Sequence, residues 1–286
     1  MRPAYGRPPW PRSGPDPAPL PGVCQVWWAC PGDVRPDHDA LLGDADLVRR
    51  ARLARPADRQ RLTAGAAVAR VVLGTALGTP PAALRIDRTC TSCGSQHGRP
   101  RLVDAEGLHF SVSHSGHCVV VAVLPGSPVG VDVEHVGDFA PGELGELAGC
   151  ALPDDEREHL ARLPAAEQPW AFTVSWVRRE AVLKATGQGL GIPPDALVVS
   201  PPSTPARVLH REGPEPVWLH DLPAPGGFVA ALAGVGTAPD DVVHRDAGLL
   251  LRQSSRRLSG PSTTLCWARP TWSGGRDWPA RTTGGG

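Results

Sequence analysis

A seven-residue stretch without a charged or hydroxyl side chain, residues 118–124 (Cys-Val-Val-Val-Ala-Val-Leu), most constrains what this chain can fold into. Valine favours extended backbone, and a strand that is apolar at every position must be covered on both faces of its sheet. The preceding residues 108–113 also have a strand pattern, and His114-Ser115-Gly116 supplies a turn between the two. The sequence therefore predicts a hairpin whose second strand is central in a buried sheet.

Length and composition narrow the class of protein. A chain of 286 residues forms one large domain or two small ones with a substantial core. Its formal net charge is zero and 41% of its residues are hydrophobic, so we expect no nucleic-acid partner. No apolar run approaches the ~18 residues of a membrane span, and the N-terminus has no apolar signal segment. Seven scattered cysteines do not indicate a disulfide framework, so we expect a cytoplasmic protein without a membrane partner.

Strands and helices alternate twice along the chain. Before residue 125 we expect, besides the hairpin, a strand at 23–30 and helices at 44–53 and 57–76. After it we expect a strand at 128–134, a helix at 167–186, and short strands at 195–200, 216–220 and 227–233. Residues 1–20 are rich in proline, and residues 247–286 show no period of 2 or 3.6. We expect both ends to be disordered or irregular, and the C-terminal tail to be dispensable.

The strand at 128–134 carries two carboxylates on one face. Val131 and Val133 point to one side of the sheet, while Asp132 and Glu134 point to the other. Two like charges at this spacing repel each other unless solvent or a cation lies between them. The pair therefore predicts either a solvated edge face or a cation site.

Residues 176–184 (Trp-Val-Arg-Arg-Glu-Ala-Val-Leu-Lys) predict a helix that stops at Gly187 and Gly189. Glu180 and Lys184 are four residues apart and share one helix face. Lys184 is the one lysine among 29 basic residues, which points to a chemical need for a compact ammonium, although an exposed helix salt bridge is the alternative. Glu180 adds a third carboxylate to the strand pair, and three hard oxygen ligands suit Mg²⁺ that also binds phosphate and water.

Together, Gly130-Val-Asp132-Val-Glu134 and Trp176-Val-Arg-Arg179-Glu180-Ala181-Val-Leu-Lys184 resemble the two signatures of the 4'-phosphopantetheinyl transferases. That family has a Gly-(Ile/Val)-Asp-x-Glu strand followed by a Trp-x-x-Lys-Glu-(Ala/Ser)-x-x-Lys helix. Arg179 stands where the family usually has lysine, a change that keeps the charge and alters the geometry. The resemblance implies the α+β fold of the monomeric Sfp-like branch, with pseudo-duplicated halves at residues 21–125 and 126–246 and the active site between them.

The resemblance also implies an activity. Such an enzyme moves the 4'-phosphopantetheine arm of coenzyme A to a serine of an apo acyl, peptidyl or polyketide carrier protein and releases adenosine 3',5'-bisphosphate. Asp132, Glu134 and Glu180 would hold Mg²⁺. Glu180 and Lys184 would be catalytic, the first as a proton acceptor and the second by neutralising phosphate charge. The family's coenzyme-binding positions correspond to Arg70, Arg99, Ser113 and His114, and the carrier is expected to dock near residues 135–165.

Three alternatives stay open on the sequence. A non-catalytic coenzyme A-binding or carrier-docking homologue could share the motifs, and so could a Mg²⁺-dependent enzyme that cleaves pyrophosphates without a protein acceptor. No Gly-x-x-x-x-Gly-Lys loop is present to support an ordinary ATPase. The third alternative concerns Cys90-x-x-Cys93 with His97, which is either a zinc site or a loop with two ordinary thiols.

Overall fold

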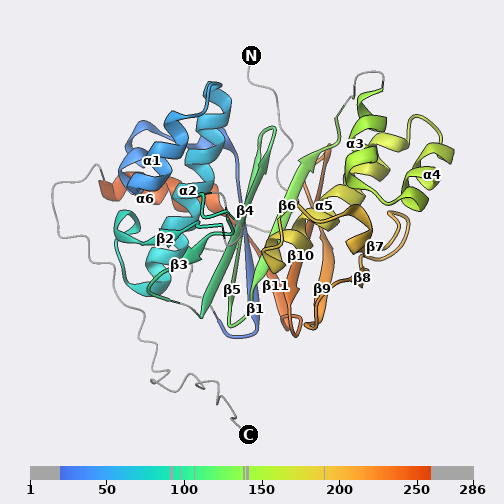
Figure 1. The fold of residues 1–286 in the computed structure, drawn as a ribbon. Helices are drawn as coiled ribbons and strands as arrows, with labels where there is room; N and C mark the ends of the chain where they lie inside the picture. Colours follow the sequence, from blue (N-terminus) through green and yellow to red (C-terminus); the bar gives the residue numbers. More distant parts are fainter. Residues whose placement is uncertain are drawn as a thin grey trace, which may run out of the picture.

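In the computed structural model, two β-sheets pack face to face between two layers of helices (Figure 1). The structure describes residues 20–90, 93–96, 98–105, 107–137, 139, 142–189 and 191–258, so the predicted irregular segment 1–19 lies outside it. Helices α1, α2 and α6 lie on one side of the sheets, and α3, α4 and α5 on the other. The chain is therefore a mixed α and β protein, as the alternation of patterns predicts.

The first sheet has four strands in the order β11 (Asp241–Asp246), β1 (Val23–Ala29), β5 (Cys118–Pro125) and β4 (Leu108–Ser115). β4 and β5 form the predicted hairpin, with Leu108 opposite Pro125 and Ser115 opposite Cys118. Alternate side chains of β5 enter two different hydrophobic cores, one under the helices and one against the second sheet. The prediction of a central strand buried on both faces is confirmed.

The second sheet has three antiparallel strands in the order β6 (Val129–His135), β10 (Phe228–Val235) and β9 (Val217–Leu222). Its inner face, with Val131 and Leu232, packs on the first sheet beside Val120 and Trp28. Its outer face is covered by α5 (Gln168–Thr186). Two smaller sheets pair β2 (Ile86–Asp87) with β3 (Arg101–Leu102) and β7 (Leu197–Val199) with β8 (Val208–Arg211).

The remaining helices pack on the outer side of the first sheet and on α5. The first sheet is covered by α1 (Asp44–Ala51) and the long α2 (Pro56–Leu77), whose small residues bury most of its length against the strands. A small separate core joins α3 (Glu143–Ala151) and α4 (Asp154–Arg162) to the start of α5. α5 thus lies between the second sheet and this small core.

The C-terminal segment differs from the prediction of an irregular tail from residue 247. Residues Ala247–Leu258 form helix α6, and Ala247, Leu250 and Leu251 are buried in the same core as α2. These positions recur at helical spacing, a period that the sequence reading missed because the stripe is only two turns long. The prediction is wrong for residues 247–258, and residues 259–286 lie outside the described residues.

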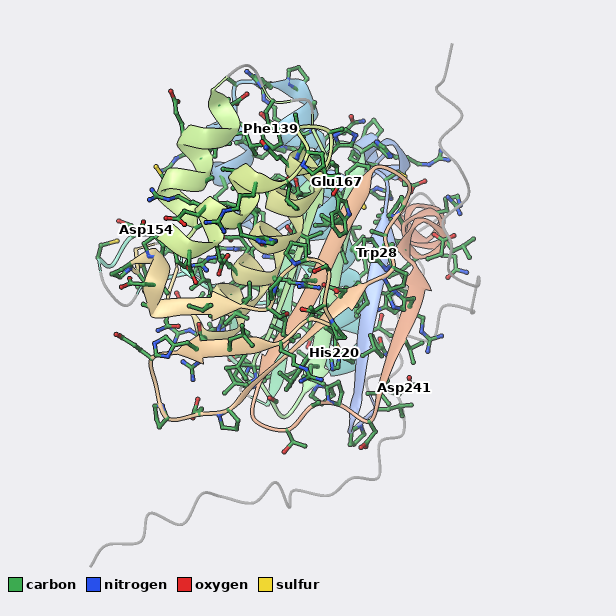
Figure 2. The ribbon with its side chains drawn as sticks, turned by 90° about the vertical axis from the view of Figure 1, so that its right-hand side faces the viewer. Trp28, Phe139, Asp154, Glu167, His220 and Asp241 are labelled. Atoms are coloured by element: carbon green, nitrogen blue, oxygen red, sulfur yellow. The ribbon has the colours of Figure 1, made fainter. Side chains whose placement is uncertain are left out.

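The strand before α6 also returns to the first sheet. β11 pairs in parallel with β1, with Val23 opposite Asp241 and Trp28 opposite Asp246. Figure 2 shows Trp28 on the strand beside the one that begins at Asp241. The Trp28 indole donates a hydrogen bond to His244 Nδ1 at 3.0 Å. The chain therefore closes its first sheet with residues that come after its second sheet.

Candidate active site

Gly130 brings the two signature segments into contact. A Cβ atom at this glycine would lie 2.1 Å from the Ala181 carbonyl oxygen and 2.4 Å from the Ala185 nitrogen. Only glycine allows α5 to lie this close to β6. The contact places Glu180 and Lys184 of the helix beside Asp132 of the strand.

Lys184 reaches across to β6 rather than along its own helix. Its Nζ lies 2.6 Å from Asp132 Oδ1, 3.1 Å from Ser113 Oγ and 3.3 Å from the Val131 carbonyl oxygen. Ser113 in turn donates its hydroxyl to Asp132 Oδ1 at 2.6 Å. The side chain of Asp132 is only 3% exposed and that of Lys184 is 29% exposed, so the carboxylate of this ion pair is desolvated. The ion pair of Lys184 therefore joins α5 to β6, and it is not the Glu180–Lys184 pair within one helix that the sequence offers as the alternative.

Glu180 and Glu134 complete a group of three acidic side chains. Burial raises the pKa of Glu180 to about 7, and the nearby charge of Asp132 adds to the rise. Burial also raises the pKa of Glu134 above its ordinary value, while a hydrogen bond from Ser115 opposes the rise. Asp132 Oδ2 and Glu180 Oε1 are buried without a hydrogen-bond partner. The charged forms of Glu180 and Glu134 are therefore disfavoured here, and a bound cation would favour them.

The donor atoms of this group fit a magnesium ion. Carboxylate oxygens are its preferred protein ligands, and two of these oxygens have no other partner. Among the described residues, no three His, Cys, Asp or Glu side chains are grouped closely enough to hold a metal ion. Asp132 is instead paired with the Lys184 ammonium. The described structure thus does not show a closed three-carboxylate site, and the assignment of Mg²⁺ to Asp132, Glu134 and Glu180 stays a prediction.

A cationic cavity lies on the other side of β4. It measures about 80 Å³ and is lined by Arg49 of α1, Arg70, Arg88 and His114, together with Asp46 and apolar side chains. Burial and the neighbouring charge of Arg49 lower the pKa of Arg88 to about 10, and its Nε is buried without a partner. His114 is an exposed residue, yet desolvation of its ring together with the charges of Lys184, Arg61 and Arg49 lowers its pKa. Such a cavity favours an anion, because phosphate would neutralise the arginines and raise the protonated fraction of His114.

The predicted coenzyme ligands Arg70 and Arg99 have protein partners in this structure. Arg70 is 2% exposed, and its guanidinium bonds Asp46 Oδ2 at 2.6 Å and the carbonyl oxygens of Pro81 and Leu84. Arg99 Nη1 donates to the carbonyl oxygen of Ala185 at 2.6 Å, near the end of α5. These contacts give both residues structural roles, and their coenzyme contacts stay predictions.

Arg49 and Arg88 line this cavity but are not among the coenzyme-binding positions that the resemblance implies. Neither belongs to a signature, and the cavity forms only because α1, α2 and β4 converge. A half-buried arginine after the short strand at residue 87 has no local pattern that would identify it. Arg99 instead lines a second hollow of about 400 Å³ with His109, whose pKa falls to about 4 through burial and the charge of Arg99.

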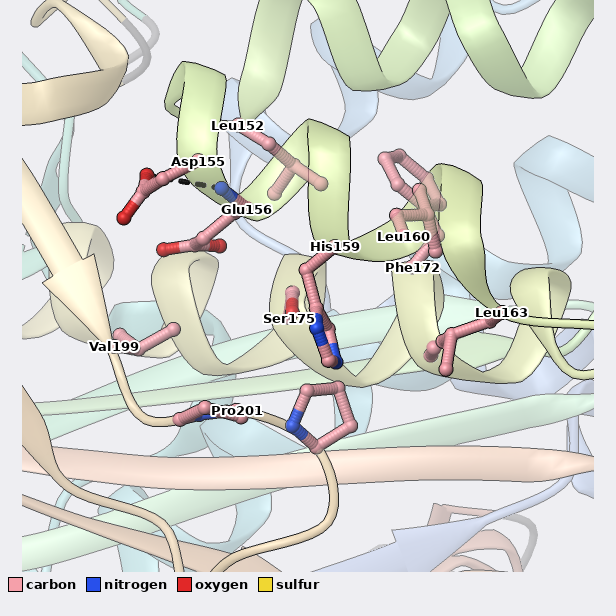
Figure 3. A pocket seen from close by; sticks show the side chains of 12 residues that line it. Leu152, Asp155, Glu156, His159, Leu160, Leu163, Phe172, Ser175, Val199 and Pro201 are labelled. Atoms are coloured by element: carbon pink, nitrogen blue, oxygen red, sulfur yellow. Dashed lines mark hydrogen bonds between the residues drawn. The ribbon is translucent and has the colours of Figure 1, made fainter.

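A third pocket lies between α5 and α4, on the side of α5 away from β6 (Figure 3). It measures about 140 Å³ and is mostly apolar, and Glu156 and His159 lie among its lining residues. Burial raises the pKa of Glu156 to about 7, although the ion pair with Arg179, at 3.6 Å, opposes the rise. Arg179 also donates to the carbonyl oxygen of Pro194. The residue that departs from the expected lysine thus joins α5 to α4 and does not contact Asp132.

The cysteine loop does not resolve the zinc alternative. Cys90 and Cys93 are not joined in a disulfide in the described part of the chain, and His97 lies outside the described residues. No helix in the described part of the chain combines the length and apolar character needed to cross a membrane.

Comparisons with known proteins agree with the geometry. Residues 128–233, which run from β6 to β10 and include Asp132, Glu180 and Lys184, match the family model of the 4'-phosphopantetheinyl transferase superfamily. The 4'-phosphopantetheinyl transferase HetI of Nostoc sp. (strain PCC 7120) is 31% identical over 204 residues, covering 70% of this chain and 81% of HetI. The putative transferase slr0495 of Synechocystis sp. is 30% identical over 167 residues, 57% of this chain and 65% of that relative. The transferase Sfp of Bacillus subtilis (strain 168) is 28% identical over 130 residues, 46% of this chain and 52% of Sfp.

Proposed function

The chain belongs to the 4'-phosphopantetheinyl transferase superfamily, and on that basis we propose that it transfers the phosphopantetheine arm of coenzyme A to a serine of an apo carrier protein, releasing adenosine 3',5'-bisphosphate. The observation that carries the proposal is that the acidic group and the arginine cavity are both lined by residues at the end of β4. Ser113 bonds the Asp132–Lys184 pair, and the next residue, His114, lines the arginine cavity. An anionic coenzyme could therefore bind beside the acidic group.

The reaction joins the carrier serine oxygen to the β-phosphorus of the coenzyme pyrophosphate and breaks the bond to the adenosine bisphosphate. We assign the serine proton to Glu180, whose carboxyl group lies within the charge field of Asp132, Lys184 and Glu134. The ammonium of Lys184, held 2.6 Å from Asp132, would neutralise charge on the transferring or leaving phosphate. Mg²⁺ bound by Asp132, Glu134 and Glu180 would screen the pyrophosphate charge.

The cationic cavity would hold the phosphate-rich end of the coenzyme. Arg49, Arg88 and His114 are the cavity residues whose side chains favour an anion there. Two packed sheets, each with its own helix layer, are what a pseudo-duplicated two-half chain would form, and we propose that arrangement for a cytoplasmic monomer. The carrier would dock near residues 135–165, where α3 and α4 cover the start of α5.

One experiment tests the proposed function. The protein is incubated with coenzyme A, Mg²⁺ and an apo carrier protein, and the carrier is weighed by mass spectrometry. Transfer adds ~340 Da to the carrier serine, the mass of the arm that a family reaction implies. Coenzyme binding without a mass gain would instead support a non-catalytic homologue. Cleavage of coenzyme A without carrier modification would indicate a pyrophosphate-cleaving enzyme.

A further inference from the structure

The two sheets meet along strands β4 and β6 without a shared backbone ladder. β4 is the edge of the first sheet and pairs with β5, while β6 is the edge of the second and pairs with β10. Three alternate serines of β4 lie on the side that faces β6: Ser111, Ser113 and Ser115. Their side chains, rather than backbone hydrogen bonds, join the described residues of these two strands.

Each serine makes a specific contact with β6. Ser111 Oγ accepts the backbone N–H of Val131 at 3.1 Å, and Ser115 Oγ accepts that of His135 at 3.2 Å. Ser113 donates to the Asp132 carboxylate at 2.6 Å, and Ser115 hydrogen-bonds Glu134. The serine row therefore binds both the edge of β6 and two of its carboxylates.

These three serines also determine the separation of β4 and β6 and the space between them. A shared ladder would bring neighbouring strands to about 4.8 Å and would use the backbone groups of the β6 edge. Here the serine hydroxyls lie between the two backbones. Lys184 Nζ also lies between the strands, where it donates hydrogen bonds to Ser113 Oγ and the Val131 carbonyl oxygen. The position of the ammonium and the separation of the strands thus depend on the same side chains.

We infer that Ser111 and Ser115 are positioning residues, which act as spacers that hold β4 and its coenzyme-side residue His114 at a fixed distance from Asp132 and Glu134 of β6. Ser115 has a second part in this role, because its hydroxyl orients Glu134. The inference rests on the proposed function for its catalytic consequence. It does not depend on that function for its effect on the acidic group.

A merely structural role gives a different result from a positioning role. A structural serine would lower stability on substitution and leave the affinity for Mg²⁺ and kcat unaltered. Partners that orient metal ligands instead cost about 10-fold or more in metal affinity when they are removed. Ser115 is half-buried whereas Ser111 is 3% exposed, so Ser115 is the safer site for a variant that must fold.

The test compares Ser115→Ala, Ser115→Thr and Ser200→Ala. Ser200 is a buried serine that accepts the Arg207 backbone N–H at 2.9 Å, and its hydroxyl also bonds Arg178 and the Pro205 carbonyl oxygen. It therefore repeats the backbone contact of Ser115 without a carboxylate partner. Calorimetric titration with Mg²⁺ and initial rates with coenzyme A and apo carrier are measured for each. We expect Ser115→Ala to lose about 10-fold in Mg²⁺ affinity and in kcat, with little change in KM for coenzyme A. Ser115→Thr keeps the oxygen and should recover most of both losses.

Two outcomes would overturn the inference: wild-type Mg²⁺ affinity and kcat in Ser115→Ala, or equal losses in Ser200→Ala. Ser111→Ala should reduce kcat in the same way if it folds, and Ser115→Ala decides the matter if it does not. If the wild-type protein modifies no carrier, the proposed function fails. The Mg²⁺ titration of the apo protein then still decides whether Ser115 orients Glu134.

Discussion

At the scale of single residues, the site depends on an ammonium in a confined position. Lys184 Nζ has three oxygen partners within 3.3 Å, and one of them belongs to a carboxylate that is 3% exposed. A guanidinium is planar and wider, so it cannot occupy the same point between β4 and β6. All the other Lys and Arg positions of the chain are arginine, and the confined space around Lys184 Nζ gives a geometric reason for lysine at this one.

Lys184→Arg should therefore fold and lose activity. We expect kcat for carrier modification to fall at least ~10-fold, about 1.4 kcal/mol of barrier, and Lys184→Ala to lose more. Circular dichroism and thermal melting would establish that the variants fold. Arg85→Lys, at an exposed residue paired with Asp104 outside the proposed docking region, is the matched control and should keep the wild-type rate. Unaltered turnover in Lys184→Arg would return Lys184 to an ordinary salt bridge.

The buried carboxyl of Glu156 gives a pH prediction. Burial raises its pKa from 4.5 to about 7 in the folded protein, so the folded state favours the neutral acid. The stability that this group contributes is present below about pH 4.5 and is lost as the pH rises through about 7. Glu156→Gln has no such loss. Relative to wild type, its free energy of unfolding should be higher at about pH 8 than at about pH 5, measured by urea titration at both values. A difference that is the same at both pH values would contradict the raised pKa.

The sequence predicts the identities of the central residues better than their partners. Asp132, Glu134, Glu180 and Lys184 were identified from spacing and motif, and the structure brings them together. That Lys184 pairs with Asp132, 52 positions away, follows only from the close approach of α5 to β6 at Gly130. Arg88 was missed for the same reason, because its cavity is made by elements that are distant in the sequence.

At the scale of elements, the strongest patterns were predicted and the weakest were not. The apolar hairpin and the helix at 167–186 match β4, β5 and α5 closely. β11 was not predicted, because four of its six residues are charged or histidine and it lies at the edge of a sheet. α6 was missed because it buries a stripe only two turns long.

Helix α6 should be required for stability, contrary to the expectation of a dispensable tail. Leu251 is fully buried, and His38 Nε2 donates a hydrogen bond to its carbonyl oxygen at 3.0 Å, since His38 Nδ1 accepts the Arg35 N–H. A chain that ends at Asp246 should lose solubility or melt well below the full chain. Leu251→Ala should cost about 2–5 kcal/mol of unfolding free energy by chemical denaturation.

A chain that ends at Leu258 is the control for this truncation. It keeps α6 and removes only residues 259–286, so it tests the part of the dispensable-tail prediction that the structure leaves open. A chain ending at Asp246 that melts like the full protein would show that the contacts of α6 with α2 contribute little.

At the scale of the whole molecule, the two sheets share one core. Trp28 and Val120 of the first sheet pack with Val131 and Leu232 of the second. β11 and α6 then return the chain to the first sheet after the second is complete. The first half of the chain therefore does not contain all the residues of its own core, since Ala247, Leu250 and Leu251 come from α6.

The molecule should therefore unfold as one unit, and hydrogen exchange can test this. Leu232→Ala removes a fully buried side chain from the second sheet at the shared core, a loss of about 2–5 kcal/mol. If the sheets unfold together, the slowest amides of β5 in the first sheet and β10 in the second should accelerate by the same factor. Leu160→Ala, in the separate core of α3 and α4, is the control and should accelerate α4 amides far more than those of β5. Faster exchange in β10 with unchanged exchange in β5 would show instead that each half opens alone.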